Sequence, residues 1–446
     1  MVVTAGQQDS RLSIHKPLMS CDLVGIARPV VKWADEVRSE ADLGTMLRRA
    51  FLDAMTPPTG PVFLSLPHDI LLGPAPTSPP VKSSISKFGV AAAVDEIAAK
   101  LRTAKSPCLI VGQELGTIDG ANAAVELAEK FQLPIYAAFM TQTGIVPPEH
   151  PLWRSDIPSN PAAIQDMLAP YDCVLYAGGQ AFQLFAFQHS DGVATGPFLS
   201  DGAEFLHIAP APEFIGRSQT TSVGTFGDLP TTLRALTAQL PSRPAQGPAI
   251  DAPASAFHGS SDLGPHSAAN VLLEVLPEGG IIHCELPLVG QAMRSMFKWK
   301  RPGQFFMSRQ TIGWAMGAAV GMNLGLGKRT HSIVIVGDGC AGFSLQALWN
   351  AAHENVPVIF AVVDNSAYGI LETMTNIFTT ASERRQEAYA ISGPALDFVR
   401  LSEGFGVPAV AVDDLPSLRE AAQAALCREG PSLIHVRIGH YFGEAK

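Results

Sequence analysis

Residues 331–369 read HSIVIVGDGCAGFSLQALWNAAHENVPVIFAVVDNSAYG, and this stretch decides the fold. Its two apolar runs, residues 332–336 and 356–363, are separated by a segment with the composition of a helix, and each run ends in small and polar residues. A short apolar run, a helix and a second apolar run are typical of two parallel strands joined by a crossover helix. The stretch therefore predicts part of an open α/β sheet.

The same alternation continues through most of the chain. Two segments rich in proline, glycine and serine, residues 73–89 and 241–265, have the composition of linkers and divide the chain into three blocks. The second and third blocks alternate short apolar runs with helical patterns, which predicts a doubly wound parallel sheet in each. The first block holds about half of the elements that an open α/β sheet needs. We expect an α/β, three-domain architecture of doubly wound parallel sheets with an incomplete N-terminal domain.

Composition excludes several classes of partner. The 446 residues are 47% hydrophobic and carry a formal net charge of −10, with no cluster of lysine or arginine. Nucleic acid and anionic membrane surfaces are therefore not expected as partners, and a phosphate ligand would have to be held by local geometry. Residues 311–327 are uncharged and just reach the length of a membrane span. Asn323 and the many small residues favour a buried helix, and a membrane span is the alternative.

The cysteines and the N-terminus bear on the compartment. The six cysteines show no C-x-x-C spacing, and the first residues lack a basic region followed by an apolar run. A cytoplasmic location is therefore predicted. The cysteines are Cys21, Cys108, Cys173, Cys284, Cys340 and Cys427.

Polar residues follow the two strands of the opening stretch. Ligands of open parallel sheets bind beyond the carboxyl ends of the strands, which is where Asp338 and Asn365 are expected. Their carboxylate and amide oxygens suit Mg²⁺, and Gly337 and Gly339 would let the backbone approach a ligand closely. A helix beginning near Cys340 would direct its amides at a phosphate. A Gly-Asp-Gly sequence is also a common turn, so this motif alone leaves both interpretations open.

The complete arrangement resembles the diphosphate-binding motif of thiamine diphosphate enzymes, in which Gly-Asp-Gly is followed, after a helix and a strand, by paired asparagines. The likeness extends to ARPVVKW, GPVFLSLPHDI, SPCLIVGQELG and LAEKFQLPIYA, which are similar to the acetolactate synthase and 2-oxo-acid decarboxylase group, and VTAGQQ resembles benzoylformate decarboxylase in particular. The resemblance implies three domains: the C-terminal half of a pyrimidine-binding domain (1–75), a central domain (88–242) and a diphosphate-binding domain (262–446).

The resemblance also assigns site residues. It implies that Mg²⁺ is held by Asp338, Asn365 and the carbonyl group of Ala367. It implies that a bulky aliphatic residue, here Ile312, wedges thiamine diphosphate into a bent shape. The residues expected to contact the cofactor are Gly337, Gly339, Cys340, Ile312 and Tyr368.

Histidines offer a weaker signal. His189 lies where the related decarboxylase carries a loop histidine as a proton carrier, so it is the candidate catalytic residue, although an ordinary surface histidine is an equally good interpretation. His283 lies on a predicted strand, and a packed histidine is the plainer interpretation there.

Three positions depart from the family pattern. Asp364 replaces the first of the paired asparagines, and we expect its carboxylate to face away from the metal. Residues 286–288 are Leu-Pro-Leu where the related decarboxylase has serine and threonine, so hydroxyl donors to the cofactor are missing. Residues 309–313 read RQTIG where the relative has paired glycines, which predicts a tighter backbone approach beside Ile312.

The glutamate that activates the cofactor in this family lies ahead of VTAGQQ in the related sequences. We therefore expect this chain to be a shortened version of a longer enzyme. Glu36 and Glu40 are expected to be solvated, and Glu285 is not expected to substitute for the missing carboxylate.

The expected activity is thiamine diphosphate and Mg²⁺ dependent decarboxylation of a small-molecule 2-oxo acid, with carboligation as an additional activity, in a homodimer or homotetramer. An acetolactate synthase type of carboligase, or a non-catalytic subunit that binds thiamine diphosphate, are the alternatives.

Overall fold

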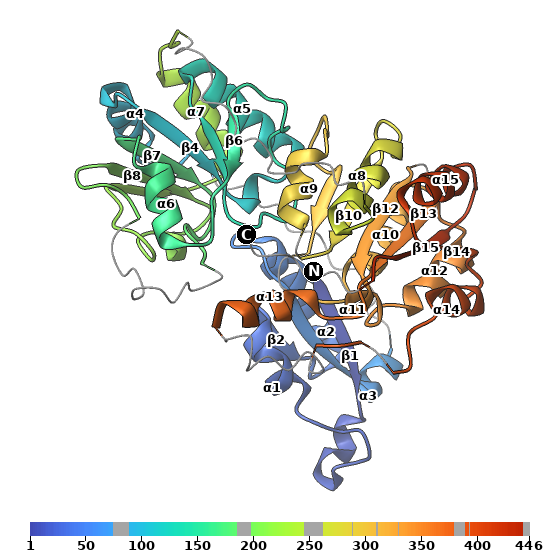
Figure 1. The fold of residues 1–446 in the computed structure, drawn as a ribbon. Coiled ribbons are helices and arrows are strands. Elements are labelled where there is room, and N and C mark those ends of the chain that lie inside the picture. The colour runs from blue at the N-terminus through green and yellow to red at the C-terminus, as the bar shows by residue number, and fades with distance from the viewer. Residues whose placement is uncertain are drawn as a thin grey trace. The chain divides into compact units, whose positions relative to one another are not determined.

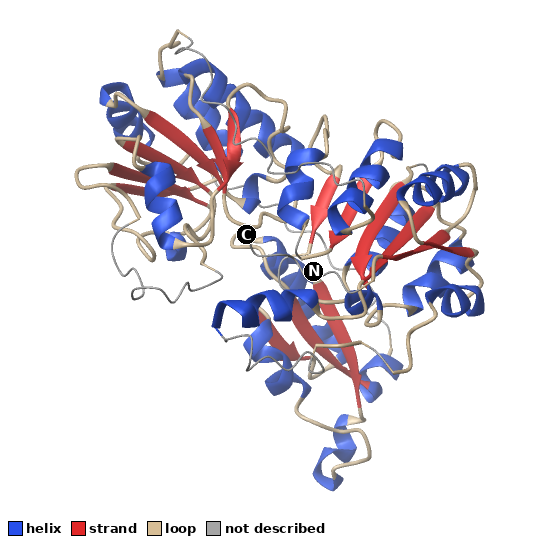
Figure 2. Ribbon diagram, viewed as in Figure 1, coloured by secondary structure: helices blue, strands red, loops and turns tan. Residues whose placement is uncertain are grey.

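The computed structural model describes residues 1–74, 89–184, 198–244, 262–287, 289–308, 311–328, 330–378, 389–391 and 393–439. The chain divides into two compact units, Met1–Gly89 and Val90–Lys446 (Figure 1). Every named strand pair is parallel, with helices on the sheet faces, which confirms the α/β fold class (Figure 2). Most of both predicted linkers falls outside the described residues, and the three domain boundaries stay predictions.

The first unit contains a three-stranded sheet in the order β1-β3-β2. Helix α2 (Glu40–Met55) buries Ala50 and Ala54 in a small cluster with Val62, since these residues form one apolar side of an otherwise polar helix. The apolar run at residues 27–33 forms mainly the end of a helix and a 3₁₀ turn. The elements are β1 (Val2–Gln7), η1 (Ser10–His15), α1 (Leu23–Ala27), η2 (Arg28–Val30), β2 (Trp33–Glu36), β3 (Val62–Pro67) and α3 (His68–Leu72).

The second unit begins with a six-stranded sheet in the order β6-β5-β4-β7-β8-β9. The chain leaves β4 toward β5 on one side and returns to β7 on the other, so the order reverses between β4 and β7. The strands are β4 (Pro107–Val111), β5 (Ile135–Ala137), β6 (Trp153–Asp156), β7 (Cys173–Ala177), β8 (Glu204–Ala209) and β9 (Val223–Phe226). The helices are α4 (Val94–Thr103), η3 (Gln113–Leu115), α5 (Ile118–Phe131), α6 (Pro161–Leu168), η4 (Pro212–Phe214) and α7 (Leu229–Gln239).

A second six-stranded sheet follows in the order β11-β10-β12-β13-β15-β14. Its central strands are buried on both faces, because successive residues such as Ile333 and Val334 enter separate apolar clusters. The strands are β10 (Ile281–Glu285), β11 (Phe305–Met307), β12 (Ser332–Gly337), β13 (Val358–Asp364), β14 (Ala409–Val412) and β15 (Ser432–Arg437). The helices are α8 (Pro265–Val275), α9 (Gly290–Met296), α10 (Ala315–Gly325), α11 (Asp338–Ala341), α12 (Gln346–Glu354), α13 (Gly369–Phe378), α14 (Phe398–Gly404) and α15 (Leu415–Leu426).

Helix α10 lies in the uncharged stretch at residues 311–327. It packs on strand β12 and buries one side, including Asn323, whose amide donates to Ser332 Oγ at 2.8 Å. Its other side, which includes Gly317, Gly321 and Leu324, is exposed. The prediction of a helix that packs in a core therefore holds for one side of α10. Within the described ranges, no helix is long and apolar enough to cross a membrane.

Candidate functional site

Three neighbouring strands of the C-terminal sheet end at one edge. In the register, Glu285 at the end of β10 pairs with Val336 of β12, and Gly337 at the end of β12 pairs with Val363 of β13. The sheet order also reverses here, since β11 lies on one side of β10 and β12 on the other. The carboxyl edge at such a reversal is where open α/β sheets bind ligands.

Asp338 is the first residue of α11 and is 2% exposed. Its Oδ2 atom has no hydrogen-bond partner among the described residues. Burial and then the negative charge of the nearby Asp364 raise the pKa of Asp338 to about 7. A buried carboxylate with a free oxygen and a raised pKa is well suited to a cation, which would favour the ionised form.

The side-chain amide of Asn365 and the carbonyl group of Ala367 lie beside this carboxylate. The side-chain oxygen of Asn365 lies 2.7 Å from the carbonyl oxygen of Ala367 and 3.2 Å from Asp338 Oδ1, and none of the three can donate a proton. A rotated Asn365 amide would donate to both neighbours, yet it would leave Asp338 Oδ2 without a partner. Octahedral Mg²⁺ with ligands at about 2.0–2.1 Å places adjacent oxygens about 2.9 Å apart, so the two separations are compatible with the ion when Asn365 presents its oxygen.

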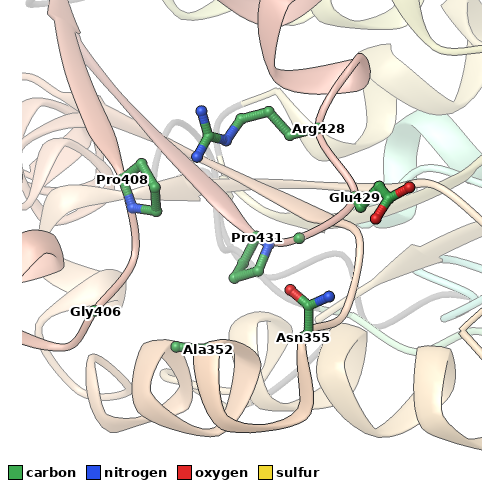
Figure 3. Close-up of a pocket in the computed structure, with 8 residues that line it drawn as sticks. Ala352, Asn355, Gly406, Pro408, Arg428, Glu429 and Pro431 are labelled. Atoms are coloured by element: carbon green, nitrogen blue, oxygen red, sulfur yellow. The ribbon is translucent and has the colours of Figure 1, made fainter.

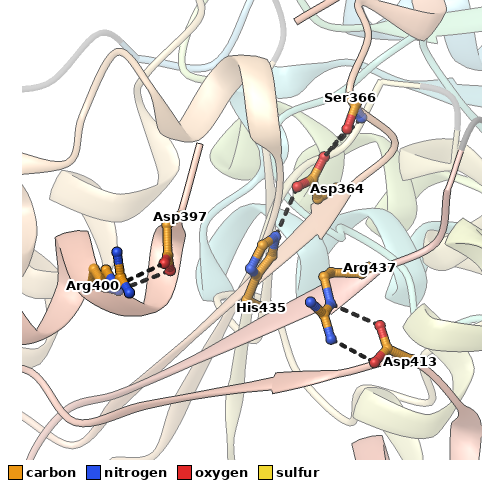
Figure 4. Close-up of polar contacts among 7 residues, drawn as sticks. All are labelled: Asp364, Ser366, Asp397, Arg400, Asp413, His435 and Arg437. Carbon is orange, nitrogen blue, oxygen red and sulfur yellow. Dashed lines mark hydrogen bonds and ion pairs between the residues drawn. The ribbon is translucent and has the colours of Figure 1, made fainter. Parts of the chain in front are cut away.

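The turn that presents Asn365 and Ala367 is held by Asp364. Ser366 has a φ of +54°, and Asp364 Oδ1 accepts hydrogen bonds from its amide at 2.7 Å and its hydroxyl at 3.1 Å. Asp364 Oδ2 lies 2.8 Å from Nε2 of His435 (Figure 4). Burial acts to raise the pKa of Asp364, but the bonds from His435 and Ser366 lower it below its ordinary value. The two oxygens of Asp364 thus bond to Ser366 and His435, while the same carboxylate lies close enough to Asp338 to help raise its pKa. That Asp364 faces away from a metal stays a prediction.

A short backbone ladder supports the same turn from the other side. The amide of Tyr368 donates to Tyr389 O at 2.8 Å, and the amide of Ile391 donates to Ser366 O at 2.7 Å. Tyr368 also packs over α11, because a Cβ on Gly339 would lie 2.6 Å from its ring. Only glycine fits at position 339. Gly337 is less constrained, since a Cβ added there would find its nearest neighbour, Leu286 Cδ1, at 3.5 Å.

The helix after Gly337 differs from the one expected. It begins at Asp338, lasts only through Ala341 and is followed by a separate helix, α12, from Gln346. The amides at this edge therefore come from a single helical turn. Cys340 lies on that turn, half-buried, and burial followed by the charges of Glu285 and Asp338 raises the pKa of its thiol to about 12.

Ile312 lies on the loop between β11 and α10, with 57% of its surface exposed. The next residue, Gly313, has a φ of +82°, and a Cβ there would lie 2.8 Å from Phe343 Cβ. The loop therefore packs closely against the segment that follows α11. The backbone that follows Ile312 thus lies close to the segment after the Asp338 turn.

Several residues considered in the sequence analysis do not contribute to the described site. His189, Leu288, Arg309 and Gln310 lie outside the described residues. Glu40 is exposed as predicted.

The expectation that Glu36 is solvated is wrong. Its carboxylate accepts a hydrogen bond from the hydroxyl of Ser65 at 2.8 Å, because β2 and β3 pair side by side and set Glu36 opposite Ser65.

Two residues of the site were not predicted from the sequence. Glu285 is 3% exposed and bonds the loop that follows Ile312, and His435 bonds Asp364. Glu285 could have been noticed as the first charged residue after the run IIHC. His435 lies inside the apolar run SLIHV, and no pattern in the sequence pairs it with Asp364.

Comparisons with known proteins agree with this geometry. The family described as "Thiamine pyrophosphate enzyme, C-terminal TPP binding domain" matches residues 289–436, and the central domain of the same enzymes matches residues 94–236. Benzoylformate decarboxylase of Pseudomonas aeruginosa is 30% identical over 98% of this chain and 81% of its own length. The chain belongs to the thiamine diphosphate-dependent enzymes.

Further relatives lie in the same family. Acetolactate synthase isozyme 1 large subunit of Escherichia coli is 23% identical over 98% of this chain and 78% of its own length. The crystal structure of benzoylformate decarboxylase from Polynucleobacter necessarius matches with a TM-score of 0.89 and 25% identity, covering 99% of this chain and 82% of that one. The 4-hydroxybenzoylformate decarboxylase of Rhodococcus jostii matches with a TM-score of 0.86 at 25% identity, covering 99% and 83%.

A cavity in this thiamine diphosphate-dependent enzyme lies away from the site. It has a volume of about 380 Å³ and is formed where β13, β14 and β15 begin, at the opposite edge of the C-terminal sheet from Asp338 (Figure 3). Ligands of such sheets bind at the carboxyl edge, so we do not assign this cavity to the cofactor. Its lining residues are Ala352, Asn355, Gly406, Pro408, Arg428, Glu429, Gly430 and Pro431.

The central sheet of the enzyme has its own reversal point, between β4 and β7. There, Oε2 of Glu114 accepts a hydrogen bond from the amide of Gly179 at 2.7 Å. A Cβ on Gly112 would lie 2.7 Å from the Cα of Gly178, so the two turns are in close contact. A nucleotide phosphate at this point would compete with the Glu114 carboxylate for the same amide.

Proposed function

We propose that this chain carries the cofactor site of a thiamine diphosphate and Mg²⁺ dependent decarboxylase that acts on a small-molecule 2-oxo acid. The observation that carries the proposal is the convergence of the Asp338 carboxylate, the Asn365 side-chain amide and the Ala367 carbonyl group at a sheet edge. Such a set is the kind of ligand group that Mg²⁺ takes together with phosphate oxygens.

Each side chain at the edge has a distinct task in this proposal. Asp338, Asn365 and the carbonyl of Ala367 would hold the metal, whose positive charge would favour binding of the diphosphate. The backbone of Gly337, Gly339 and Cys340, with Tyr368 beside it, lines the diphosphate, and the amides of α11 offer partial positive charge to it. Hydroxyl donors are replaced by Leu286, so these amides and the metal carry most of the anion binding.

The exposed Ile312 side chain sets the shape of the bound cofactor, as its position on an anchored loop beside α11 supports. When bound, thiamine diphosphate supplies the electron sink that a 2-oxo acid needs to lose carbon dioxide. The protein contributes geometry and exclusion of water. His189 is retained as the proposed catalytic histidine on the family resemblance alone.

The decarboxylase proposal is favoured over an acetolactate synthase activity by the 30% identity to a benzoylformate decarboxylase, against 23% to the acetolactate synthase of Escherichia coli. Carboligation is proposed as a secondary activity. Two assays separate these activities, namely release of carbon dioxide from benzoylformate and condensation of pyruvate to acetolactate.

The decisive comparison uses Asp338→Ala and Asp413→Ala, each assayed with thiamine diphosphate and Mg²⁺. Asp413 pairs with Arg437 at the exposed surface, so its variant controls for the loss of a carboxylate. Asp338→Ala is expected to abolish cofactor binding and turnover, while Asp413→Ala keeps both. Unchanged binding and turnover in Asp338→Ala would refute the site. Binding of thiamine diphosphate without turnover of either substrate would instead favour a non-catalytic subunit.

We also propose that the protein forms a homodimer or homotetramer. Helices α10 and α12 pack against each other and leave Leu324 and Trp349 exposed, the latter at 55%. Phe343, in the segment between α11 and α12, is 60% exposed. Large exposed apolar side chains on neighbouring elements mark an interface, and a second copy is the partner that the proposed enzyme class supports. Analytical ultracentrifugation of wild type and Trp349→Glu tests this. A wild-type monomer at micromolar concentration would exclude it.

A further inference from the structure

Glu285 is a buried residue at the site to which the proposed function assigns no role. It ends β10 beside the reversal point of the C-terminal sheet and is 3% exposed. Burying a carboxylate is costly unless hydrogen bonds replace its water. The bonds that Glu285 makes therefore indicate what it is there to hold.

Both oxygens of Glu285 bond to the backbone that follows Ile312. Oε1 accepts from the amide of Gly313, and Oε2 accepts from the amide of Ala315 at 2.6 Å. Ala315 is the first residue of α10, so the carboxylate also neutralises the positive end of that helix. Two bonds to one short segment fix the path of the backbone on the carboxyl side of Ile312.

Glu285 also interacts with the turn that lines the proposed diphosphate site. Burial raises the pKa of Glu285 above its ordinary value, and the neighbouring backbone amides and the nearby Cys340 side chain on α11 oppose that shift. These amides include those of Ala315 and Gly313. One buried side chain thus bonds the loop that follows Ile312 and lies beside the helix turn of Cys340, since its charge helps to raise the pKa of that thiol.

We propose that Glu285 is a positioning residue for the cofactor. It holds the Ile312 loop at a defined distance from α11, so that the loop bends thiamine diphosphate while α11 binds its diphosphate. This inference rests on the proposed function, because it assumes that Ile312 contacts the cofactor. It adds a residue that itself touches neither metal nor diphosphate.

A helix cap that only stabilised the fold would make the same bonds, so the test needs a readout that separates the two roles. Inorganic pyrophosphate with Mg²⁺ contacts the α11 turn and the metal ligands but has no part that reaches Ile312. Comparing the dissociation constants of thiamine diphosphate and pyrophosphate in the same variant therefore isolates the contribution of the Ile312 loop to cofactor binding.

The variants are Glu285→Gln and Glu285→Asp, with Glu114→Gln as the matched control. Glu114 is also a carboxylate that accepts a hydrogen bond from a backbone amide, that of Gly179, but it lies on η3, after β4 of the central sheet. In Glu285→Gln an amide NH₂ replaces one acceptor, and in Glu285→Asp the side chain is too short for both bonds.

We expect Glu285→Gln to weaken thiamine diphosphate binding by at least about tenfold and pyrophosphate binding by less than about threefold. Hydrogen exchange at the amides of Gly313 and Ala315 is expected to accelerate in the ligand-free variant. Glu114→Gln is expected to change neither affinity.

Two results would overturn the positioning role. The first is an equal fold-loss of thiamine diphosphate and pyrophosphate affinity in both Glu285 variants. The second is unchanged affinity for both ligands with only a lower melting temperature, which is the signature of a plain helix cap. If Glu285→Gln fails to fold, Glu285→Asp supplies the same comparison. Failure of the proposed function is distinct, because the wild type itself would then not bind thiamine diphosphate.

Discussion

Nε2 of His435 lies 2.8 Å from Oδ2 of Asp364, at the point where β15 and β13 run side by side. This contact occupies the carboxylate that replaces an asparagine of the family pattern. The other oxygen of Asp364 holds Ser366 in its left-handed conformation. Asp364 is thus bonded to a histidine on the neighbouring strand and to the turn that presents Asn365.

The contact predicts the effect of removing the histidine. His435→Phe keeps a ring against Phe398 but leaves Asp364 Oδ2 half-buried without a donor, which is expected to cost about 1–3 kcal/mol of stability. Chemical denaturation followed by fluorescence measures the change. Arg400→Ala is the control, because the Arg400–Asp397 pair is exposed and its loss should cost less than about 1 kcal/mol (Figure 4). Equal losses in the two variants would contradict the prediction.

Replacement of Gly313 is expected to disturb the Ile312 loop. Gly313→Ala combines a φ of +82° with a Cβ placed 2.8 Å from Phe343 Cβ, so we expect about 1–3 kcal/mol of destabilisation and weaker thiamine diphosphate binding. Gly404→Ala is the matched control, because Gly404 is helical and a Cβ there meets nothing within 4 Å. That change is expected to be neutral or stabilising. Calorimetry measures the melting temperatures of both variants. An unchanged melting temperature in Gly313→Ala would contradict the predicted clash between the added Cβ and Phe343.

A buried ion pair connects the central sheet to α9. Arg294 is 2% exposed, bonds Asp156 Oδ1 at 2.9 Å and also donates to the hydroxyl and carbonyl groups of Thr141. Burial raises the pKa of Asp156 even though Arg294 opposes the shift. Arg294→Ala is therefore expected to destabilise the protein by about 3–5 kcal/mol, because it leaves a buried carboxylate unpaired.

An exposed ion pair serves as the control for Arg294→Ala, and a double variant tests whether removing both charges restores stability. Arg437→Ala removes an exposed ion pair with Asp413 and is expected to change stability by less than about 1 kcal/mol. The double variant Arg294→Met/Asp156→Leu is expected to recover most of the loss, since no charge is then buried. Urea denaturation of the three variants provides the measurement. A double variant as unstable as Arg294→Ala would show that the lost packing, and not the unpaired charge, dominates.

The buried His283 is expected to make the stability of the folded state sensitive to acid. Its side chain is fully buried and stacks on Phe306, with the two ring centroids 5.6 Å apart. Burial lowers the pKa of His283 to about 3. Between about pH 6.5 and pH 3 the unfolded chain binds a proton at this residue and the folded chain does not, so stability falls as the pH falls, by about 1.4 kcal/mol per unit. His283→Leu removes this contribution. Its loss of stability from pH 7 to pH 5 should be smaller than that of the wild type, and equal losses would refute the assignment.

The sequence alone determined the fold class and the place of the site. Short apolar runs alternating with helices allow little besides parallel α/β sheets, because such runs must be buried on both faces. The polar residues after β12 and β13 had to meet at one edge, because neighbouring parallel strands end together. Asp338, Asn365 and Ala367 were therefore predictable from spacing and resemblance.

Only the tertiary structure decided which partners complete that site. Glu285 reaches the amides of Gly313 and Ala315, 28 and 30 residues away, and His435 reaches Asp364 across 71 residues. The helix after Gly337 was also shorter than its sequence suggested. Hydrogen bonds between distant segments depend on strand order and register, which local patterns do not encode. The sequence therefore predicted candidate metal ligands, which stay a prediction, whereas the structure determined which residues bond to the segments that carry them.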